Sequence, residues 1–212
     1  MGKLSGLYVI TDERLTPYEG GKIFELVERA LRGGAKVVQL RDKKRKDSEL
    51  VEIALRLKEL AHRYSALFII NDRVSLAKEV DADGVHLGKE DESLEEALKK
   101  LKGKIIGISC YGSLERAKRA EALGASYVAF GSFFPSPTKP ESEVIPFEIL
   151  SLAKRELKIP ICAIGGITLE KAEKLIKLGA DLIAVISDIW LSEDIEKRAF
   201  SYTELFKKYG KL

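Results

Sequence analysis

The segment Leu178-Gly179-Ala180-Asp181-Leu182-Ile183 carries the pattern that decides the fold, because its shape recurs elsewhere in the chain. Gly33-Gly34-Ala35-Lys36-Val37-Val38 and Leu123-Gly124-Ala125-Ser126-Tyr127-Val128 also place glycine and alanine ahead of an apolar run, and Asp81-Ala82-Asp83-Gly84-Val85 is a looser copy. Glycine ends a helix readily in the left-handed conformation, and alanine lets the following strand pack closely. Each copy therefore predicts a helix that turns into a strand.

Short apolar runs alternate along the chain with amphipathic stretches, which is the pattern of parallel β/α units. The predicted strands are Leu7–Thr11, Lys36–Leu40, Leu67–Ile70, Gly84–Leu87, Lys104–Ile108, Tyr127–Phe130, Ile159–Ile164 and Leu182–Ile186. The predicted helices are Gly21–Leu31, Ser48–Tyr64, Ser93–Leu101, Leu114–Leu123, Pro146–Arg155, Leu169–Leu178 and Ser192–Lys208. Eight strands in 212 residues favour an α/β fold of the TIM barrel type over an open doubly wound sheet. We expect one catalytic domain, residues 1–212.

Composition argues against several classes of partner. The net charge is only +3, with acids and bases interleaved, so no basic stripe of the kind that binds nucleic acid stands out. The two cysteines, Cys110 and Cys162, lie far apart, which favours reduced thiols over a disulfide or a zinc site. No apolar run approaches the roughly 20 residues that span a bilayer. We expect a cytoplasmic protein that acts on small molecules.

Polar residues follow the predicted strands at their carboxyl ends, where the loops of such barrels carry the chemistry. Gln39, Arg41 and Lys43 alternate, so on a continuing strand they would point to one side as a row of hydrogen-bond donors suited to an oligophosphate. The alternative is a solvated turn with ion pairs at the barrel rim.

Asp72 and Asp91 follow the third and fourth strands, which are neighbours in a barrel. The two carboxylates could share one Mg²⁺ ion, because Mg²⁺ takes one or two carboxylates together with water and phosphate oxygens. Capping of the next helix is the alternative for each residue.

Two further segments could hold a phosphate group. The loop 133–140 carries Ser136, Thr138 and Lys139 between prolines that stiffen it, although an ordinary surface loop has the same composition. Gly165-Gly166 opens a helix, and Ser187 follows the eighth strand, which is the usual phosphate site of these barrels. His86 ends a strand, and both an acid or base role and a packed core histidine remain open for it.

Taken in order along the chain, these motifs resemble the thiamine phosphate synthase family, also called thiamine phosphate pyrophosphorylase. The segments that carry the resemblance are Leu7–Asp12, Gln39–Lys43, Ile70–Arg73, Ala82–Gly88 with Asp91, Gly107–Ser109, Pro135–Lys139 and Ala163–Ile167. The resemblance implies a transferase that condenses a hydroxymethylpyrimidine diphosphate with a thiazole phosphate, or its carboxylate, giving thiamine phosphate and diphosphate. It also implies Mg²⁺ as cofactor and a dissociative mechanism.

The resemblance further implies a role for each motif residue. Those that would hold the pyrimidine diphosphate are Gln39, Arg41, Lys43, Asn71, Ser109 and Lys139, of which Arg41, Lys43 and Lys139 would be catalytic. Asp72 and Asp91 would ligate the metal, and the thiazole phosphate would bind at Ser136, Thr138, Gly166, Ile186 and Ser187. The alternatives are a related thiazole tautomerase, a non-catalytic barrel that binds thiamine precursors, and a sugar-phosphate epimerase using His86 with Asp12.

Overall fold

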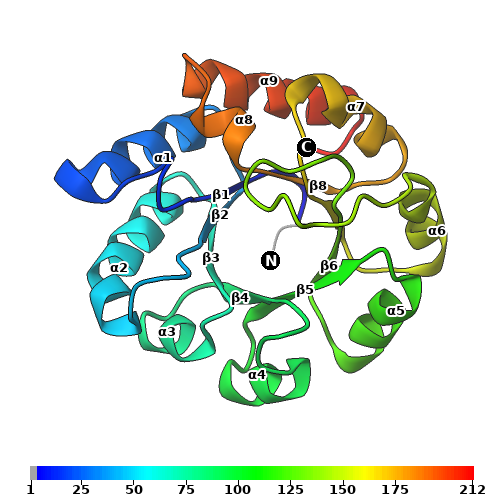
Figure 1. Ribbon diagram of the computed structural model, residues 1–212, viewed down its shortest axis with the longest axis horizontal. Coiled ribbons are helices and arrows are strands. Elements are labelled where there is room, and N and C mark those ends of the chain that lie inside the picture. The colour runs from blue at the N-terminus through cyan, green and yellow to red at the C-terminus, as the bar shows by residue number, and fades with distance from the viewer. Residues whose placement is uncertain (1–3) are drawn as a thin grey trace.

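Eight parallel strands close into a barrel in the computed structural model, which describes residues 4–212. The strands are β1 (Gly6–Ile10), β2 (Val37–Leu40), β3 (Leu67–Asn71), β4 (Gly84–Leu87), β5 (Ile105–Tyr111), β6 (Tyr127–Phe130), β7 (Ile161–Ala163) and β8 (Leu182–Val185). Around them lie η1 (Glu19–Gly21), α1 (Lys22–Arg32), α2 (Asp47–Arg63), α3 (Val74–Glu79), α4 (Leu94–Lys100), α5 (Leu114–Leu123), α6 (Glu148–Glu156), α7 (Leu169–Lys177), α8 (Ser187–Trp190) and α9 (Ile195–Lys208) (Figure 1). The predicted TIM barrel is confirmed.

The helix-to-strand joints have the backbone that the sequence pattern predicts. Gly34, Gly124 and Gly179 all have positive φ, at 104°, 106° and 123°. The alanine that follows each glycine is buried, and its N–H donates to a carbonyl five residues earlier, as Ala180 does to Leu175 at 3.1 Å. This 6→1 bond satisfies a carbonyl that the helix end leaves unpaired.

Two joints use the same geometry without glycine. Asp81 has φ 51° ahead of Ala82, and Ser65 has φ 57° ahead of Ala66. Both alanines are buried and make the same backward hydrogen bond, 2.9 Å long in each case. The helix-to-strand joint predicted at Asp81–Val85 is thus confirmed. The joint at Ser65 was not predicted, because no glycine marks it in the sequence.

The structure differs from the predicted elements at several boundaries. β5 extends to Tyr111, beyond its predicted end at Ile108, and its register against β6 shifts between Ser109 and Tyr111. The last helix begins at Ile195 because Asp194 caps it, its Oδ1 accepting from Lys197 N at 3.0 Å. The sequence did not predict η1, α3 or α8, which span three, six and four residues. Elements this short leave too few positions for a periodic pattern.

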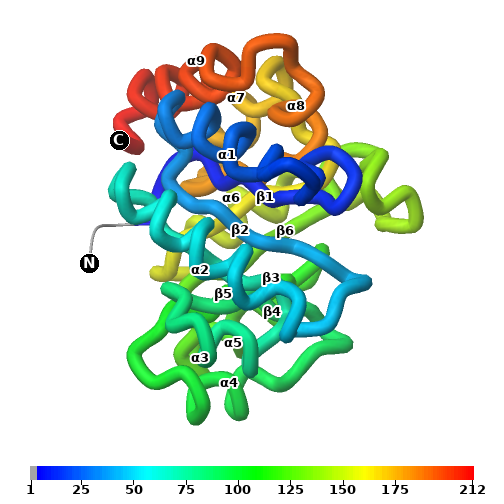
Figure 2. The backbone as a smooth tube through the Cα atoms, turned by 90° about the vertical axis from the view of Figure 1, so that its left-hand side faces the viewer, coloured from blue at the N-terminus to red at the C-terminus, as the bar shows by residue number. Residues whose placement is uncertain are grey.

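The amino ends of the strands are closed by a small polar cluster near the C-terminus. Ser5 Oγ donates to the carbonyl of Lys211 at 2.7 Å, and Lys211 Nζ donates to Asp181 Oδ1 at 2.9 Å. In the side view the C-terminus lies at one end of the barrel and the loop between β6 and α6 extends from the other (Figure 2). The predicted site residues therefore face away from the chain end. A search of the helices within residues 4–212 finds none that could cross a membrane.

Candidate active site

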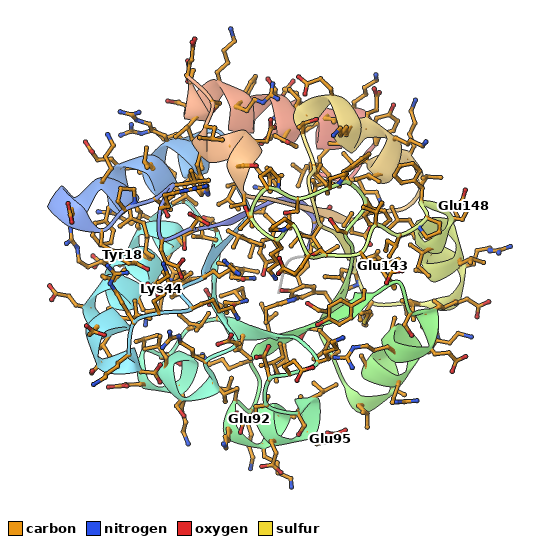
Figure 3. The ribbon with its side chains drawn as sticks, viewed as in Figure 1. Tyr18, Lys44, Glu92, Glu95, Glu143 and Glu148 are labelled. Carbon is orange, nitrogen blue, oxygen red and sulfur yellow. The ribbon has the colours of Figure 1, made fainter. Side chains whose placement is uncertain are left out.

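The loop after β2, residues 41–46, is held in shape by the buried carboxylate of Asp42. Its Oδ1 accepts from the backbone N–H groups of Lys44 and Arg45, both at 2.8 Å. Its Oδ2 accepts from Tyr18 Oη at 2.8 Å and from Arg45 Nη1 at 3.1 Å. Tyr18 and Lys44 lie close together near the outer edge of the barrel, beside α1 and α2 (Figure 3). Burial alone raises the pKa of Asp42, but these hydrogen bonds, led by those from Arg45 and Lys44, keep the pKa below its ordinary value.

We expect Asp42→Asn to destabilise the protein by about 1 to 3 kcal/mol at neutral pH, because buried donors lose their charged acceptor. A lowered folded-state pKa means that the carboxylate contributes stability above its unfolded pKa of about 3.9 and loses it as the pH falls through the folded value. The stability difference between wild type and variant should therefore narrow below about pH 4. Free energies of unfolding from urea titrations across this pH range test the prediction.

The matched control is Asp47→Asn, which weakens the half-exposed ion pair between Asp47 and Arg73. Such a pair contributes roughly 0 to 1 kcal/mol, so this variant should stay close to wild type. Equal losses in the two variants, or an Asp42 difference that does not depend on pH, would contradict the assigned role of Asp42.

Of the predicted row of donors, only Gln39 lies on β2. β2 ends at Leu40, so Lys43 lies in the loop and not on a continuing strand. Gln39 is buried, and both of its polar atoms already have partners: Nε2 donates to Tyr8 Oη at 2.7 Å, and Oε1 accepts from Asn71 Nδ2 at 2.9 Å. The prediction that alternation along a strand produces the row was wrong, because the Asp42 turn sets the positions beyond Leu40.

Two of the three predicted cations nevertheless affect the third electrostatically. Burial lowers the pKa of Lys139, and the positive charges of Arg41 and Lys43 lower it further. Lys43 Nζ forms an ion pair with Asp72. Within the described residues, Arg41 Nε is buried without a hydrogen-bond partner. Cations that crowd together in this way favour an anionic ligand, which would relieve their mutual repulsion.

The two predicted metal ligands are not helix caps. Asp72 has φ 52°, its N–H donates to His86 O at 2.8 Å, and its carboxylate faces Lys43. Asp91 Oδ2 accepts from Gly88 N at 2.7 Å, while Ser93 caps α4. The capping alternative is therefore wrong for both aspartates.

The donor set fits Mg²⁺ better than it fits a metal held only by protein. No group of three or more histidine, cysteine, aspartate or glutamate side chains that could hold a metal occurs within residues 4–212. Two carboxylates at the ends of adjacent strands are what Mg²⁺ uses when water and phosphate oxygens complete its shell. The ammonium of Lys43 against Asp72 shows that this carboxylate already accepts a cationic partner.

A chain of hydrogen bonds crosses the barrel interior below the cations. From Gln39 it passes through Tyr8 Oη to Tyr127 Oη at 2.7 Å, then to His86 Nδ1 at 2.7 Å, and from His86 Nε2 to Ser109 Oγ at 2.7 Å. Burial lowers the pKa of His86 to about 3, and the charges of Lys139 and Lys43 contribute to this shift. The sequence did not indicate Tyr8 or Tyr127, because each reads as an ordinary strand residue.

The acid and base pair that an epimerase would need is not assembled. His86 is enclosed between Tyr127 and Ser109, as expected for a packed histidine. Asp12 Oδ1 accepts from the N–H groups of Arg14 and Leu15, both at 2.9 Å, so this carboxylate shapes a turn.

The proline-bounded loop packs against the glycine turn after β7. Phe133 N and Phe134 N donate to the carbonyls of Ile164 and Gly165, at 3.3 and 3.1 Å. Gly166 has φ 62°, and a Cβ at this position would lie 2.3 Å from Pro135 O. The close approach brings the Ser136 to Lys139 segment over the turn, and within it Ser136 Oγ accepts from Lys139 N at 3.2 Å.

Asp188 joins the two segments that the sequence predicts to hold the second phosphate. It lies on α8, directly after Ile186 and Ser187, and its Oδ2 accepts from Leu169 N at the start of α7 at 3.0 Å. The same carboxylate accepts from Tyr202 Oη at 2.6 Å and from Arg198 Nη2 at 2.7 Å. Asp188 therefore holds the starts of α7 and α8 together, and no sequence pattern indicated this residue.

The fold and the site define a class: a TIM barrel enzyme with a cationic carboxyl-end mouth suited to phosphate esters. The sequence model of the family described as thiamine monophosphate synthase matches residues 7–189. A thiamine-phosphate synthase of Nitrosococcus oceani is 44% identical over 208 residues, covering 98% of this chain and 95% of that protein. One from Wolinella succinogenes is 47% identical over 190 residues, covering 89% and 86%.

A solved structure agrees with these relatives. The thiamine phosphate pyrophosphorylase from Pyrococcus furiosus has a TM-score of 0.88 and 42% identity, covering 97% of both chains. The chain belongs to the thiamine monophosphate synthase family, which confirms the resemblance in its sequence. It is accordingly a transferase of thiamine biosynthesis.

Proposed function

We propose that this chain joins a hydroxymethylpyrimidine diphosphate to a thiazole phosphate at the carboxyl end of its barrel, releasing thiamine phosphate and diphosphate. Family membership supports the overall reaction. The observation that carries the substrate assignment is the cluster of Arg41, Lys43 and Lys139, in which burial lowers the pKa of Lys139 and the charges of Arg41 and Lys43 lower it further. A diphosphate group would neutralise all three cations. We also propose that residues 1–212 act as one catalytic domain.

The chemistry of the side chains divides the pyrimidine diphosphate site into two parts. The cations suit the diphosphate, and the amide and hydroxyl groups of Gln39, Asn71 and Ser109 suit the ring. Asn71 Oδ1 is buried with no hydrogen-bond partner in the described part of the chain, so it is available to a donor on the ligand. An amino group on the pyrimidine would supply that donor.

The thiazole phosphate is assigned to the segments around the glycine turn. Ser136 and Thr138 would approach it from the loop after β6, Gly166 from the turn after β7, and Ile186 and Ser187 from the start of α8. Backbone N–H groups and hydroxyls of this kind bind phosphate without a full positive charge. Under this assignment, Arg41, Lys43 and Lys139 remain available to bind the diphosphate.

Asp72 and Asp91 would hold Mg²⁺ in this proposal. Magnesium, when bound, supplies positive charge against the departing diphosphate. The protein's own cations act on the same charge, so Arg41, Lys43 and Lys139 are the catalytic residues that we propose.

The proposed mechanism needs no protein nucleophile. The bond between the pyrimidine methylene carbon and the diphosphate oxygen breaks, and diphosphate leaves with the bonding electron pair. The pyrimidine ring stabilises the resulting carbocation, and the lone pair of the thiazole nitrogen then forms the new C–N bond. The chain contributes stabilisation of the leaving group and alignment of the acceptor.

The test is to incubate the protein with both substrates and to measure diphosphate release and thiamine phosphate formation, with Mg²⁺ and with a chelator. We expect both products in a 1:1 ratio only when Mg²⁺ is present. Tight binding of the substrates without turnover would indicate a binding barrel, and rearrangement of the thiazole alone would indicate a tautomerase. Two buried free cysteines suit a reducing compartment, and we propose the cytoplasm.

A further inference from the structure

The orientation of the Gln39 and Asn71 amides, together with a count of the protons, gives the hydrogen-bond chain inside the barrel one direction. Gln39 Nε2 donates to Tyr8 Oη, so the single proton of Tyr8 is left for its other partner, Tyr127 Oη. Tyr127 then accepts from Tyr8, and its own proton points to His86 Nδ1. Because Nδ1 accepts, the neutral imidazole carries its proton on Nε2 and donates it to Ser109 Oγ.

The alternative protonation states fit these contacts less well. A doubly protonated imidazole would donate to Tyr127, which would then accept from both Tyr8 and His86 and keep a proton without a partner. With the amide oxygen of Gln39 directed at Asn71, as in the structure, the reverse direction would require the Tyr8 proton to point at the amide nitrogen of Gln39, which is itself a donor. The contacts therefore favour the neutral Nε2–H form.

Packing keeps the two rings at the centre of this chain in place. His86 and Tyr127 stack with their centroids 5.5 Å apart and an interplanar angle of 27°. Gly107 makes room for the tyrosine, because a Cβ there would lie 2.1 Å from Tyr127 Cζ. Tyr8 meets the same ring edge-on, at 6.0 Å between centroids. The imidazole is thus held with one nitrogen toward Tyr127 and the other toward Ser109.

We propose that His86 is a positioning residue that acts through Ser109. Fixed as the Nε2–H tautomer by Tyr127, it occupies a lone pair of the serine oxygen and leaves the serine proton free for the substrate. The other end of the hydrogen-bond chain, Asn71 Oδ1, is an acceptor with no partner among residues 4–212. The barrel thereby presents one donor and one acceptor to a bound ring, a pattern that matches a ring nitrogen and an amino group. This specificity argument rests on the proposed function, since the ring is that of the pyrimidine substrate.

The tautomer can be measured without any catalysis. The chain has two histidines, and His62 lies outside the barrel, where its Nε2 contacts Asp83. Long-range ¹H–¹⁵N spectra of ligand-free, histidine-labelled protein will contain two imidazole patterns, and His62→Gln assigns them. We expect His86 to show a single Nε2–H pattern at neutral pH. An Nδ1–H or an imidazolium pattern would overturn the proposal, whether or not the enzyme makes thiamine phosphate.

The coupling to substrate is tested with Tyr127→Phe, which removes the donor to Nδ1. We expect a mixture of His86 tautomers and a KM for the pyrimidine diphosphate raised about 10-fold, with the KM for the thiazole phosphate unchanged. Tyr64→Phe is the matched control, since Tyr64 Oη donates to Glu28 in the helical layer and should affect neither KM. Equal changes in the two KM values would assign Tyr127 a purely structural role.

Two substitutions of His86 complete the test. Gln keeps an N–H donor for Ser109, whereas Leu, of similar bulk, has none. We expect His86→Gln to retain most of the affinity for the pyrimidine diphosphate and His86→Leu to lose about 10-fold or more. If the two variants bind this substrate equally while circular dichroism shows both folded, the donor role of His86 is wrong.

Discussion

Asp72→Asn is expected to lower kcat/KM for thiamine phosphate formation by about 100- to 1,000-fold, because under the proposed mechanism it removes a carboxylate that would hold Mg²⁺ against the leaving diphosphate. Asparagine preserves the shape of the residue and tolerates the positive φ of 52° at this position. The substitution therefore removes the negative charge of the side chain without altering its shape or the backbone. Steady-state rates across a Mg²⁺ titration measure it, and we expect the variant to require a higher Mg²⁺ concentration.

Asp81→Asn provides a closely matched control. Asp81 has φ 51° and forms an ion pair with Lys104 at 2.7 Å, but it lies at a helix-to-strand joint, on the opposite end of the barrel. Its replacement should leave kcat/KM within about 2-fold of wild type, since surface ion pairs contribute little. If Asp72→Asn behaves like this control, Asp72 is not a metal ligand.

Gly166→Ala is expected to raise the KM for the thiazole phosphate by about 100-fold and to lower kcat. The added methyl group would lie 2.3 Å from the carbonyl oxygen of Pro135, so the loop that carries Ser136 and Thr138 must move away from the turn. A displacement of about 1 Å in a substrate-positioning segment is enough for an effect of this size. The KM for the pyrimidine diphosphate should change much less.

The positive φ of Gly166 by itself also disfavours alanine, and Gly210→Ala separates this effect from the clash. Gly210 has φ 67°, similar to the 62° of Gly166, and a Cβ there would meet no atom of the described residues within 4 Å. Both variants should lose about 1 to 2 kcal/mol of stability from the left-handed conformation. Only Gly166→Ala should affect the thiazole phosphate, and equal kinetics for both would contradict the assigned turn.

The sequence predicts the barrel well because its strongest signals are local. Gly34, Gly124 and Gly179 mark helix ends by a backbone conformation that few other residues adopt, and each stands three residues ahead of the first residue of a buried strand. Ser65 adopts the same conformation without such a signal, because a buried alanine and a 6→1 hydrogen bond compensate for its strain.

The residue pattern indicates candidate site residues best where a polar side chain follows the end of a strand. Asp72, Asp91 and Lys139 have that position, and their chemistry suggests a use. Tyr8 and Tyr127 are separated by 119 residues, and the bond between them depends on the register across the closed barrel. No local pattern contains that information.

The sequence did not indicate the structural roles of two single acidic residues, for a different reason. Asp42 and Asp188 each accept several hydrogen bonds that shape the loops of the mouth, but the donors are backbone N–H groups and side chains of other elements. A carboxylate between an arginine and a lysine, or one on a four-residue helix, reads as a solvated charge until the backbone around it is known.

The contact between Ser5 Oγ and Lys211 O, 2.7 Å long, has a practical consequence for engineering. A short peptide could join Lys211 to Ser5 there, and new ends could be opened at another joint on the same face, such as the one at Gly103, where an added Cβ would meet no described atom within 4 Å. Such a circular permutation keeps the order of strands around the barrel. Surface immobilisation or a fused reporter attached at that face would leave the carboxyl ends of the strands unobstructed.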